Sequence, residues 1–389
     1  MSRLYPFSHS PIECHFNPSP RDFVVKEIPL YEPSGSGEHC LVYVRKKGLS
    51  TFELLNLLSQ VLGCKVRDIG YAGLKDKSAM TYQYISIHRS LRPKLESAAV
   101  FLEQKQVKIL NIAYHHNKLK VGHLKGNHFF MRLKKCLSLS ATKIESVLAS
   151  LSQSGFPNYF GDQRFGKDGN NFQSGRALAH KKEHIKNKKM SNFLISSYQS
   201  HLFNEWLNAR INLSQILHHF SVSEAQKALQ DSKIPAFRAL AQECSAQVLG
   251  DLQNQKQHFI LLNGDIMCHY PFGKAFICEE PSSESTRFIQ RDIAPTGALC
   301  GTKLTYAQGL SALCENLYID TQIKASGSRR YAWVWAEDIQ SEYIAQKAHF
   351  ELCFSLPKGS YATIFLESLL NRPLVQELAQ DSQDEMSNV

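Results

Sequence analysis

The stretch GYAGLKDKSAMTYQYISIH, residues 70–88, holds the features from which we predict the fold and the site. Its second half, TYQYISIH, is rich in aromatic and β-branched residues and predicts a strand. The preceding segment contains two glycines and a single carboxylate, Asp76, which stands between Lys75 and Lys77. This segment predicts a loop, the part of a fold on which functional side chains are commonly mounted.

The residues upstream place this loop in a strand–helix–strand order. RDFVVKEI (21–28) and HCLVYVRKKG (39–48) predict strands, because valine and aromatic residues are frequent in both. STFELLNLLSQVLG (50–63) predicts a helix, because Ser50 and Glu53 form a capping box and apolar residues recur at helical spacing. The loop with the acid therefore lies in a βαβ-like order of elements.

The residues downstream predict more strands and a helical segment between them. Strands are expected at 107–115 and 118–134, and helical patterns dominate 174–250. Near the end, HFELCFSL (349–356) has an apolar residue at every second position, which is typical of one face of a strand. Sheet-like segments at both ends and a helical middle favour one α+β domain interrupted by an insertion over two domains in tandem.

Composition and charge narrow the class of protein. The 389 residues are 43% hydrophobic and 21% charged, as in globular proteins, with neither a secretory signal at the start nor a run of about 18 apolar residues. We therefore expect a cytoplasmic protein without membrane contact. Residues 1–190 contain 30 basic and 14 acidic residues, a balance of +16, and the remainder contains 15 and 21, a balance of −6. The basic half predicts a polyanionic partner such as nucleic acid.

Several kinds of site lack their signatures. The ten cysteines are dispersed without a C-x-x-C, and no histidine pair has a partner at zinc-finger spacing. There is no G-x-x-x-x-G-K-[ST] phosphate loop and no G-x-G-x-x-G after a strand. We therefore expect neither a metal nor a nucleotide cofactor.

Asp76 has a structural interpretation and a functional one. LKDKS is compatible with a polar turn that contains a solvated ion pair, and its spacing alone favours this interpretation. The flanking ammonium groups would also keep the carboxylate ionised, because opposite charge stabilises the charged form of an acid. An ionised carboxylate suits a nucleophile and not a general acid.

A second candidate site is NYFGDQRFG, residues 158–166. Asn158 offers an amide, Phe160 a flat ring and Arg164 a planar cation. Together they could hold a nucleobase, because aromatic stacking contributes about 1–3 kcal/mol and an amide can bind the polar edge of a base. A buried aromatic loop between two helices is the competing interpretation. The lysine run AHKKEHIKNKKM (179–190) predicts either a solvated helix face or a phosphate contact.

Five segments, in the family's order, resemble the TruD family of tRNA pseudouridine synthases. GYAGLKDKSAMTYQ is similar to the nucleophile motif of that family, and NYFGDQRFG to its second hallmark. The other three are SPRDFVVKEIPLYEPSGSGEHCLVYVRKKGLST, PTGALCGTK and FSLPKGSYATIFLESLL. The resemblance implies a pseudouridine synthase fold, an α+β domain with a central antiparallel sheet. The expected catalytic domain comprises 1–183 and 327–389, and a largely helical α+β insertion, the TRUD domain, comprises 184–326.

The resemblance also implies a reaction, the conversion of a uridine of tRNA, expected at position 13, to pseudouridine without cofactor or metal. It implies Asp76 as the nucleophile and Phe160 as the ring beneath the target base. Asn158 and Phe23 match further active-site positions of the family. A protein partner is not predicted.

One position departs from the family pattern. Family members often have a lysine near the catalytic acid at the position of Asn17. Lys75, Lys77 or Arg21 could supply the missing cation. We also expect Lys75, Lys77 and Arg164 to contact the substrate.

Two other functions stay open on the sequence alone. A tRNA-binding protein without catalysis would use the same basic half, although the intact Asp76 argues against it. An N-glycosidase acting on RNA would break the same bond and release uracil. Glycoside hydrolysis ordinarily needs a second acid, and Asp162 is the nearest candidate.

Overall fold

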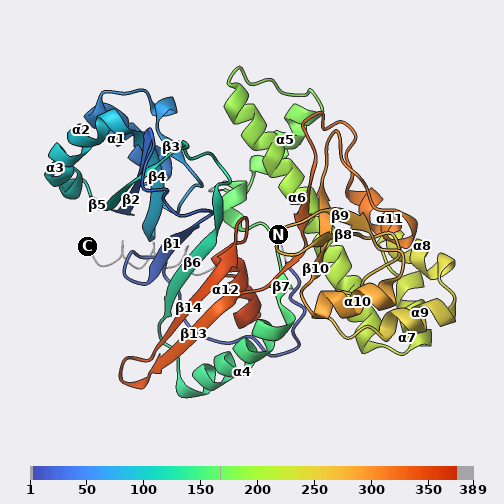
Figure 1. Cartoon of the computed structure of the whole chain (residues 1–389). Coiled ribbons are helices and arrows are strands. Elements are labelled where there is room, and N and C mark those ends of the chain that lie inside the picture. The colour runs from blue at the N-terminus through green and yellow to red at the C-terminus, as the bar shows by residue number, and fades with distance from the viewer. Residues whose placement is uncertain (1–2, 167, 375–389) are drawn as a thin grey trace. The chain divides into compact units, whose positions relative to one another are not determined.

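The computed structural model describes residues 3–166 and 168–374, and the chain divides into two compact units. The first, which we call the sheet unit, comprises Ile12–Val147 and Ala336–Gly359. The second, the helix-rich unit, comprises Leu148–Trp335 together with the described residues 3–11 and 360–374. Figure 1 labels the elements of both units.

A mixed sheet of eight strands forms the sheet unit, in the order β13–β14–β6–β1–β4–β2–β5, with β3 paired to β4. The strands are β1 Phe23–Pro29, β2 His39–Lys47, β3 Gly70–Tyr71, β4 Met80–His88, β5 Val107–His115, β6 Leu124–Leu133, β13 Glu337–Ile344 and β14 His349–Pro357. β1 and β4 run parallel, and the other pairs are antiparallel. The expected central antiparallel sheet is therefore wrong in this pair, and the sheet is mixed. Parallel neighbours need a crossover, which the chain makes through β2 and α1.

Three helices cover one face of the sheet at β2, β4 and β5, as Figure 1 shows: α1 Thr51–Leu62, α2 Arg92–Ser97 and α3 Ala99–Gln104. The predicted capping box of α1 is confirmed, because the Ser50 hydroxyl accepts from the Glu53 backbone and the Glu53 carboxylate accepts from the Ser50 backbone. The core between helices and sheet includes Val42, Val44, Leu54, Leu58, Ile85 and Ile87. Burying each such side chain contributes about 1.5–3 kcal/mol.

The same face of the sheet is apolar at β1, β6 and β14. The predicted alternation of β14 is confirmed, because its four inward residues are at most 2% exposed: Phe350, Leu352, Phe354 and Leu356. The Phe129 ring stacks on Phe354 with 5.4 Å between ring centres, and Phe23 lies parallel to Phe129 at 6.4 Å. These rings therefore pack together on the buried face of β1, β6 and β14.

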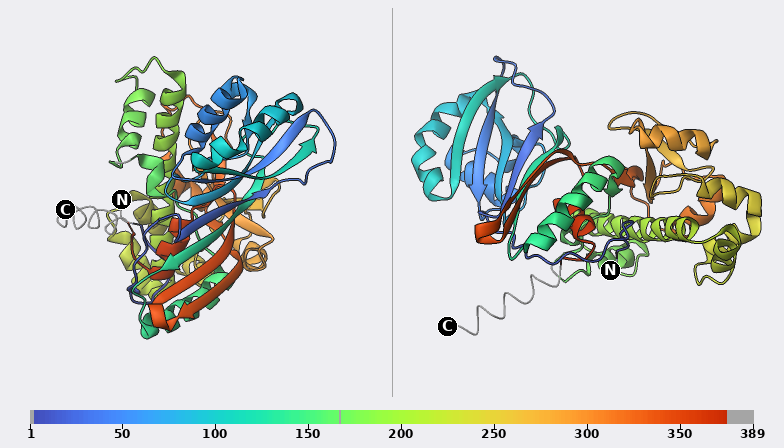
Figure 2. Two further views of the ribbon diagram at one scale, coloured as in Figure 1. Left: turned by 90° about the vertical axis from the view of Figure 1, so that its left-hand side faces the viewer. Right: turned by 90° about the horizontal axis from the view of Figure 1, so that it is seen from below.

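The helix-rich unit is built around α6, Lys188–His219, which Figure 2 shows as one long helix. The other helices are α5 Asn171–Ala179, α7 Val222–Gln230, α8 Pro235–Glu243, α9 Ala246–Gln253, α10 Pro281–Ile289, α11 Gly309–Glu315 and α12 Ala362–Leu370, while α4, Ser138–Ser154, continues from the sheet unit. One small sheet has the order β11–β10–β8–β9 and another pairs β12 with β7. Their strands are β7 Phe156–Pro157, β8 Ile266–His269, β9 Ala275–Ile277, β10 Ile293–Leu299, β11 Ser328–Tyr331 and β12 Trp333–Val334.

The mixture of sheet and helix confirms the α+β class, whereas the expected insertion boundaries at residues 184 and 326 stay a prediction. Within the described residues, no helix is both long enough and apolar enough to cross a membrane.

Candidate active site

Asp76 lies half-buried on the loop that joins β3 to β4, and hydrogen bonds fix the backbone around it. The backbone N–H of Lys75 donates to Oγ1 of Thr51, the first residue of α1, over 2.9 Å. The Nζ of Lys46, from β2, donates to the backbone oxygen of Asp76 over 3.2 Å. The loop is thereby tied to a helix and to β2, an inner strand of the sheet, so the fold sets the position of the carboxylate.

The two lysines beside Asp76 both pair with other acids. Nζ of Lys75 lies 2.6 Å from an oxygen of Glu27 on β1, and both side chains are at most 2% exposed. Burial raises the pKa of Glu27, and the charge of Lys75 opposes that shift. Nζ of Lys77 lies 2.8 Å from Glu53, where both side chains reach solvent. Lys75 thus anchors the loop inside the sheet unit, whereas Lys77 stays at its surface.

Lys46 places a buried ammonium group beside the loop. Its side chain is 0% exposed, and Nζ donates to the backbone oxygen of Leu49 over 2.6 Å as well as to Asp76. Burial lowers the pKa of Lys46 to about 8, and the charge of Asp76 opposes this shift. The carboxylate and the ammonium group therefore interact electrostatically.

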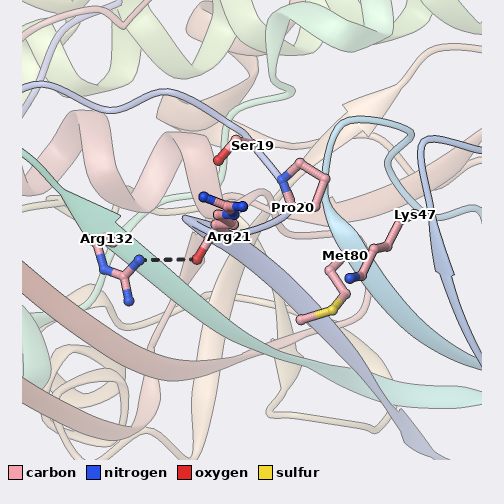
Figure 3. A pocket seen from close by; sticks show the side chains of 6 residues that line it. All are labelled: Ser19, Pro20, Arg21, Lys47, Met80 and Arg132. Atoms are coloured by element: carbon pink, nitrogen blue, oxygen red, sulfur yellow. Dashed lines mark hydrogen bonds between the residues drawn. The ribbon is translucent and has the colours of Figure 1, made fainter.

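Phe23 and Arg21 lie at the entry to β1. The Phe23 ring is 3% exposed and packs against Phe16 and Phe129, so it belongs to the interior of the sheet unit. Arg21 is exposed and lines an open pocket of about 620 Å³, drawn in Figure 3. The other lining residues are Ser19, Pro20, Lys47, Met80 and Arg132. Figure 3 also shows Arg132 donating to the backbone oxygen of Arg21, over 3.4 Å.

In the helix-rich unit, the segment 158–166 follows β7 and is clamped by α6. Oδ1 of Asn204 accepts from the backbone N–H of Phe160 over 2.8 Å, and Nδ2 of Asn204 donates to the backbone oxygen of Phe160 over 3.0 Å. At Gly161, a Cβ would lie 3.0 Å from the Tyr361 ring, so the absence of a side chain lets the loop pack there. The Phe160 ring is 8% exposed.

Asn158 orients a guanidinium group against this ring. Its Nδ2 donates to the backbone oxygen of Tyr331 over 3.0 Å, and its Oδ1 accepts from Nη2 of Arg330 over 2.9 Å. The same Nη2 donates to the backbone oxygen of Asn158 over 2.9 Å. The central carbon of Arg330 lies 3.9 Å from the centre of the Phe160 ring, a cation–π contact.

Arg164 adds a second guanidinium group, 5.8 Å from the centre of the Phe160 ring. It donates to the hydroxyls of Ser196 and Ser200, over 2.6 and 3.1 Å. Burial lowers the pKa of both arginines, to about 10 for Arg330, and both remain charged at neutral pH. In the part of the chain that the structure describes, neither has a carboxylate partner. Two guanidinium groups without counter-charges suit an anionic or carbonyl-rich ligand.

The structure groups the predicted residues in two sets. Asp76, Lys75 and Lys77 share one loop of the sheet unit, with Phe23 on the strand beside β4. The second set, in the helix-rich unit, consists of Asn158, Phe160 and Arg164. Asp162 forms an ion pair with the buried Arg3, which gives this acid a structural partner.

Three residues of these sites were not predicted from the sequence, namely Lys46, Asn204 and Arg330. The sequence does indicate that Lys46 is buried, because this residue continues the series Cys40, Val42 and Val44 at every second position of β2 and so belongs to the buried face. No such indication exists for Arg330 and Asn204, since they lie 172 and 44 residues from the positions that they contact.

The lysine run 179–190 is not one helix. α5 ends at Ala179 and α6 begins at Lys188, so an exposed connection separates them. The alternative of one solvated helix face is therefore wrong, whereas the phosphate contact stays a prediction. All five lysines of the run are exposed.

Comparisons with known proteins agree on one family. The family model described as tRNA pseudouridine synthase D (TruD) matches residues 2–184. The chain is 66% identical to the tRNA pseudouridine synthase D of Helicobacter hepaticus over 95% of this chain and 96% of that protein. It is 49% identical to that of Wolinella succinogenes, over 96% and 99%. A crystal structure assigned as tRNA pseudouridine synthase D of Methanosarcina mazei aligns with a TM-score of 0.57 at 20% identity, over 96% of this chain and 97% of that one, which shows a similar fold.

Proposed function

Because the chain belongs to the TruD family of tRNA pseudouridine synthases, we propose that it isomerises a uridine of tRNA, expected at position 13, with Asp76 as the nucleophile. The observation that carries this proposal is the Asp76 loop. A half-buried carboxylate stands on a backbone held by Thr51 and Lys46, with a buried ammonium group in electrostatic range. A solvated turn would need none of these buried contacts.

The reaction balances without a cofactor. The C1′–N1 glycosidic bond of the uridine breaks and its electron pair stays on the uracil, the uracil turns, and a C1′–C5 bond forms. C5 then loses its hydrogen as a proton and N1 takes up a proton, so the product is an isomer of the substrate. Asp76 either attacks C1′ or assists departure of the base through a glycal, and both routes use an ionised carboxylate. The target nucleotide must leave its stack, at a cost of a few kcal/mol.

We assign Lys46 the part that the family pattern gives to a lysine at the position of Asn17. Its ammonium group favours the ionised form of Asp76, and its hydrogen bond to the Asp76 backbone holds the loop. Lys75 supports the same loop through Glu27, and Lys77 is left as the solvent-exposed candidate for substrate contact.

We assign Phe160, Asn158 and Arg164 to the binding of the base and its phosphate. The Phe160 ring is 8% exposed and Arg330 lies 3.9 Å from its centre, so a base stacks on the guanidinium plane or displaces it from the ring. The uncompensated charge of Arg164 and Arg330 would attract the phosphate of the flipped nucleotide and offset the cost of unstacking. We assign Phe23 an indirect part, since it packs in the interior of the sheet unit that carries the Asp76 loop.

Nucleoside analysis tests the proposed reaction. Unmodified tRNA is incubated with the wild-type protein in EDTA without added nucleotide, then digested and separated by chromatography. We expect pseudouridine to appear in the amount by which uridine declines. Free uracil would favour an N-glycosidase, and unchanged nucleosides in RNA that is nevertheless bound would favour a binding protein. The cytoplasmic location expected from the sequence stays a prediction.

A further inference from the structure

The face of the eight-stranded sheet opposite α1–α3 carries a row of basic and aromatic side chains. The strand registers place Arg45, Tyr82, Lys26 and His128 directly beside one another on β2, β4, β1 and β6. Since neighbouring strands lie about 4.8 Å apart, this row spans about 14 Å. Lys26 is exposed, and the other three are half-buried.

Aromatic rings continue on both sides of the row. Nζ of Lys26 lies 5.7 Å from the centre of the Tyr82 ring, and Tyr43 stacks on Tyr84 with 4.6 Å between ring centres. On the other side Phe130, also half-buried, lies beneath the guanidinium group of Arg132 at 5.4 Å. The face thus offers flat apolar surfaces between cations.

Three cations of this face lack counter-charges. Within the described residues, Lys26, Arg45 and Lys47 have no ion pair, whereas Arg132 is matched by Asp22 and Glu351. All residues of β1, β2, β4 and β6 are described, and they contain a single acid, Glu27, which lies on the opposite face in its pair with Lys75. A positive surface with half-buried rings complements a nucleic-acid strand, which supplies both phosphates and bases.

The surface is hollowed and ends beside the catalytic loop. A depression of about 270 Å³ is lined by Val24, Lys26, Met80, Tyr82, His128, Phe130 and Cys353. Met80 also lines the pocket of about 620 Å³ in Figure 3, which contains Arg21 and Lys47. Met80 is the first residue of β4 and follows Asp76 by one short loop segment. The hollow surface therefore reaches the end of β4 that connects to the Asp76 loop.

We propose that this open sheet face is a second RNA-contact surface, which binds an unpaired segment of the substrate RNA through Lys26, Arg45 and Tyr82. The inference rests on the proposed function only in taking that RNA to be the tRNA substrate. Phosphates would lie between the cations, and bases would stack on the tyrosines. The contacts lie outside the reacting groups, so they affect the binding of the RNA and not its chemistry.

The first experiment measures binding of an oligouridylate of about 12 nucleotides and of unmodified tRNA at several salt concentrations. A plot of log K against log salt has a negative slope. In the Lys26→Gln/Arg45→Gln variant we expect this slope to become less negative by about 1.4, since each single-strand phosphate contact contributes about 0.7. Tyr82→Ala should weaken oligouridylate binding by about fivefold or more. The matched control is Lys227→Gln/Lys233→Gln, which removes two exposed charges from the helix-rich unit.

A second experiment uses the wild-type protein and needs no variant to fold. Oligouridylate that contains 4-thiouridine is cross-linked by light, and the modified peptides are identified by mass spectrometry. We expect cross-links in the β4 peptide that contains Tyr82. Steady-state kinetics of the lysine–arginine variant should show a KM for tRNA raised severalfold with kcat unchanged, and Lys26→Arg/Arg45→Lys should restore KM.

Two results would overturn the proposal. One is a salt slope and a KM equal to wild type in the double variant, with cross-links only in other peptides. The other is displacement of the oligouridylate by polyglutamate of equal charge, which would show that the face attracts charge and not an RNA strand. If the wild-type protein forms no pseudouridine, the proposed function fails, and the oligouridylate slope and cross-links still decide the role of this surface.

Discussion

Replacing Lys46 by methionine separates the effect of this residue on catalysis from its effect on stability. The pKa of Lys46 is 10.5 in the unfolded chain and about 8 in the folded protein, where the side chain is 0% exposed. This difference corresponds to a destabilisation of about 3 kcal/mol at pH 7, because the buried amine is held in its charged form. Lys46→Met removes that cost. It also removes the donor to the backbone oxygens of Leu49 and Asp76, which costs about 1–3 kcal/mol for each.

The two effects nearly offset each other at pH 7, so we expect the variant to unfold with about the same free energy as wild type. Their dependence on pH differs. Below pH 8 the lysine is protonated in both states, whereas between pH 8 and 10.5 only the unfolded chain keeps the proton, so wild-type stability rises with pH relative to the variant. The free energy of unfolding of wild type minus that of Lys46→Met should increase by about 2 kcal/mol from pH 7 to about pH 9.5.

Unlike stability at pH 7, catalysis should change strongly in the Lys46→Met variant. We expect kcat of Lys46→Met to fall by about 100-fold, since a displacement of the Asp76 loop of about 1 Å is enough for such a decrease. The wild-type pH–rate profile should decline on its basic side with an apparent pKa near 8, and this decline should be absent in the variant. Urea unfolding and single-turnover kinetics at each pH supply the two measurements. Lys65→Met serves as the control, because it removes an exposed lysine charge from the same unit at a residue outside the proposed site.

If the difference in unfolding free energy between wild type and Lys46→Met stays constant over this range of pH, the claim that Lys46 is both buried and charged is refuted. An equal decrease of activity in Lys46→Met and Lys65→Met would show that net charge, and not the buried position of Lys46, is what matters.

Three further predictions concern the helix-rich unit. Phe160→Leu keeps the volume but not the ring and should lower kcat/KM by about 5- to 100-fold, whereas unchanged turnover would show that the ring only fills space. Arg330→Lys should reduce kcat/KM nearly as much as Arg330→Gln, because the planar group holds Asn158 and Phe160; full activity of the lysine variant would show that charge suffices. Replacing Lys181, Lys186 and Lys189 by glutamine should reduce the salt dependence of tRNA binding by about 0.7–0.9 in slope for each phosphate that is no longer neutralised, and an unaltered slope would place these lysines away from the RNA.

The sequence predicted those elements whose signals are local. α1 has its capping box and β14 its alternation, because both patterns lie within one element and depend on its own burial. Strand direction is not local, and the parallel pairing of β1 with β4 could not be distinguished from an antiparallel pair. The prediction for the lysine run was wrong for a related reason, since good helix-forming residues do not reveal that a connection must separate α5 from α6.

The candidate sites divide in the same way. Asp76 and Phe160 are candidates on the sequence because each lies in a short motif, and Lys46 could have been added from its place in the alternation of β2. The contact between Asn158 and Arg330 joins residues 172 positions apart, and neither composition nor spacing predicts it. A polar group buried by the fold finds its partner through tertiary structure, which a single sequence does not contain.

The most direct test of the central claim is the release of tritium from tRNA labelled at C5 of uridine. Wild type is compared with Asp76→Asn and with Asp68→Asn, which alters an exposed acid at the entry to β3. We predict release by wild type and by Asp68→Asn without cofactor and in EDTA. Asp76→Asn should release none while its affinity for tRNA stays close to that of wild type. Release by Asp76→Asn at the wild-type rate would contradict the assignment of the nucleophile.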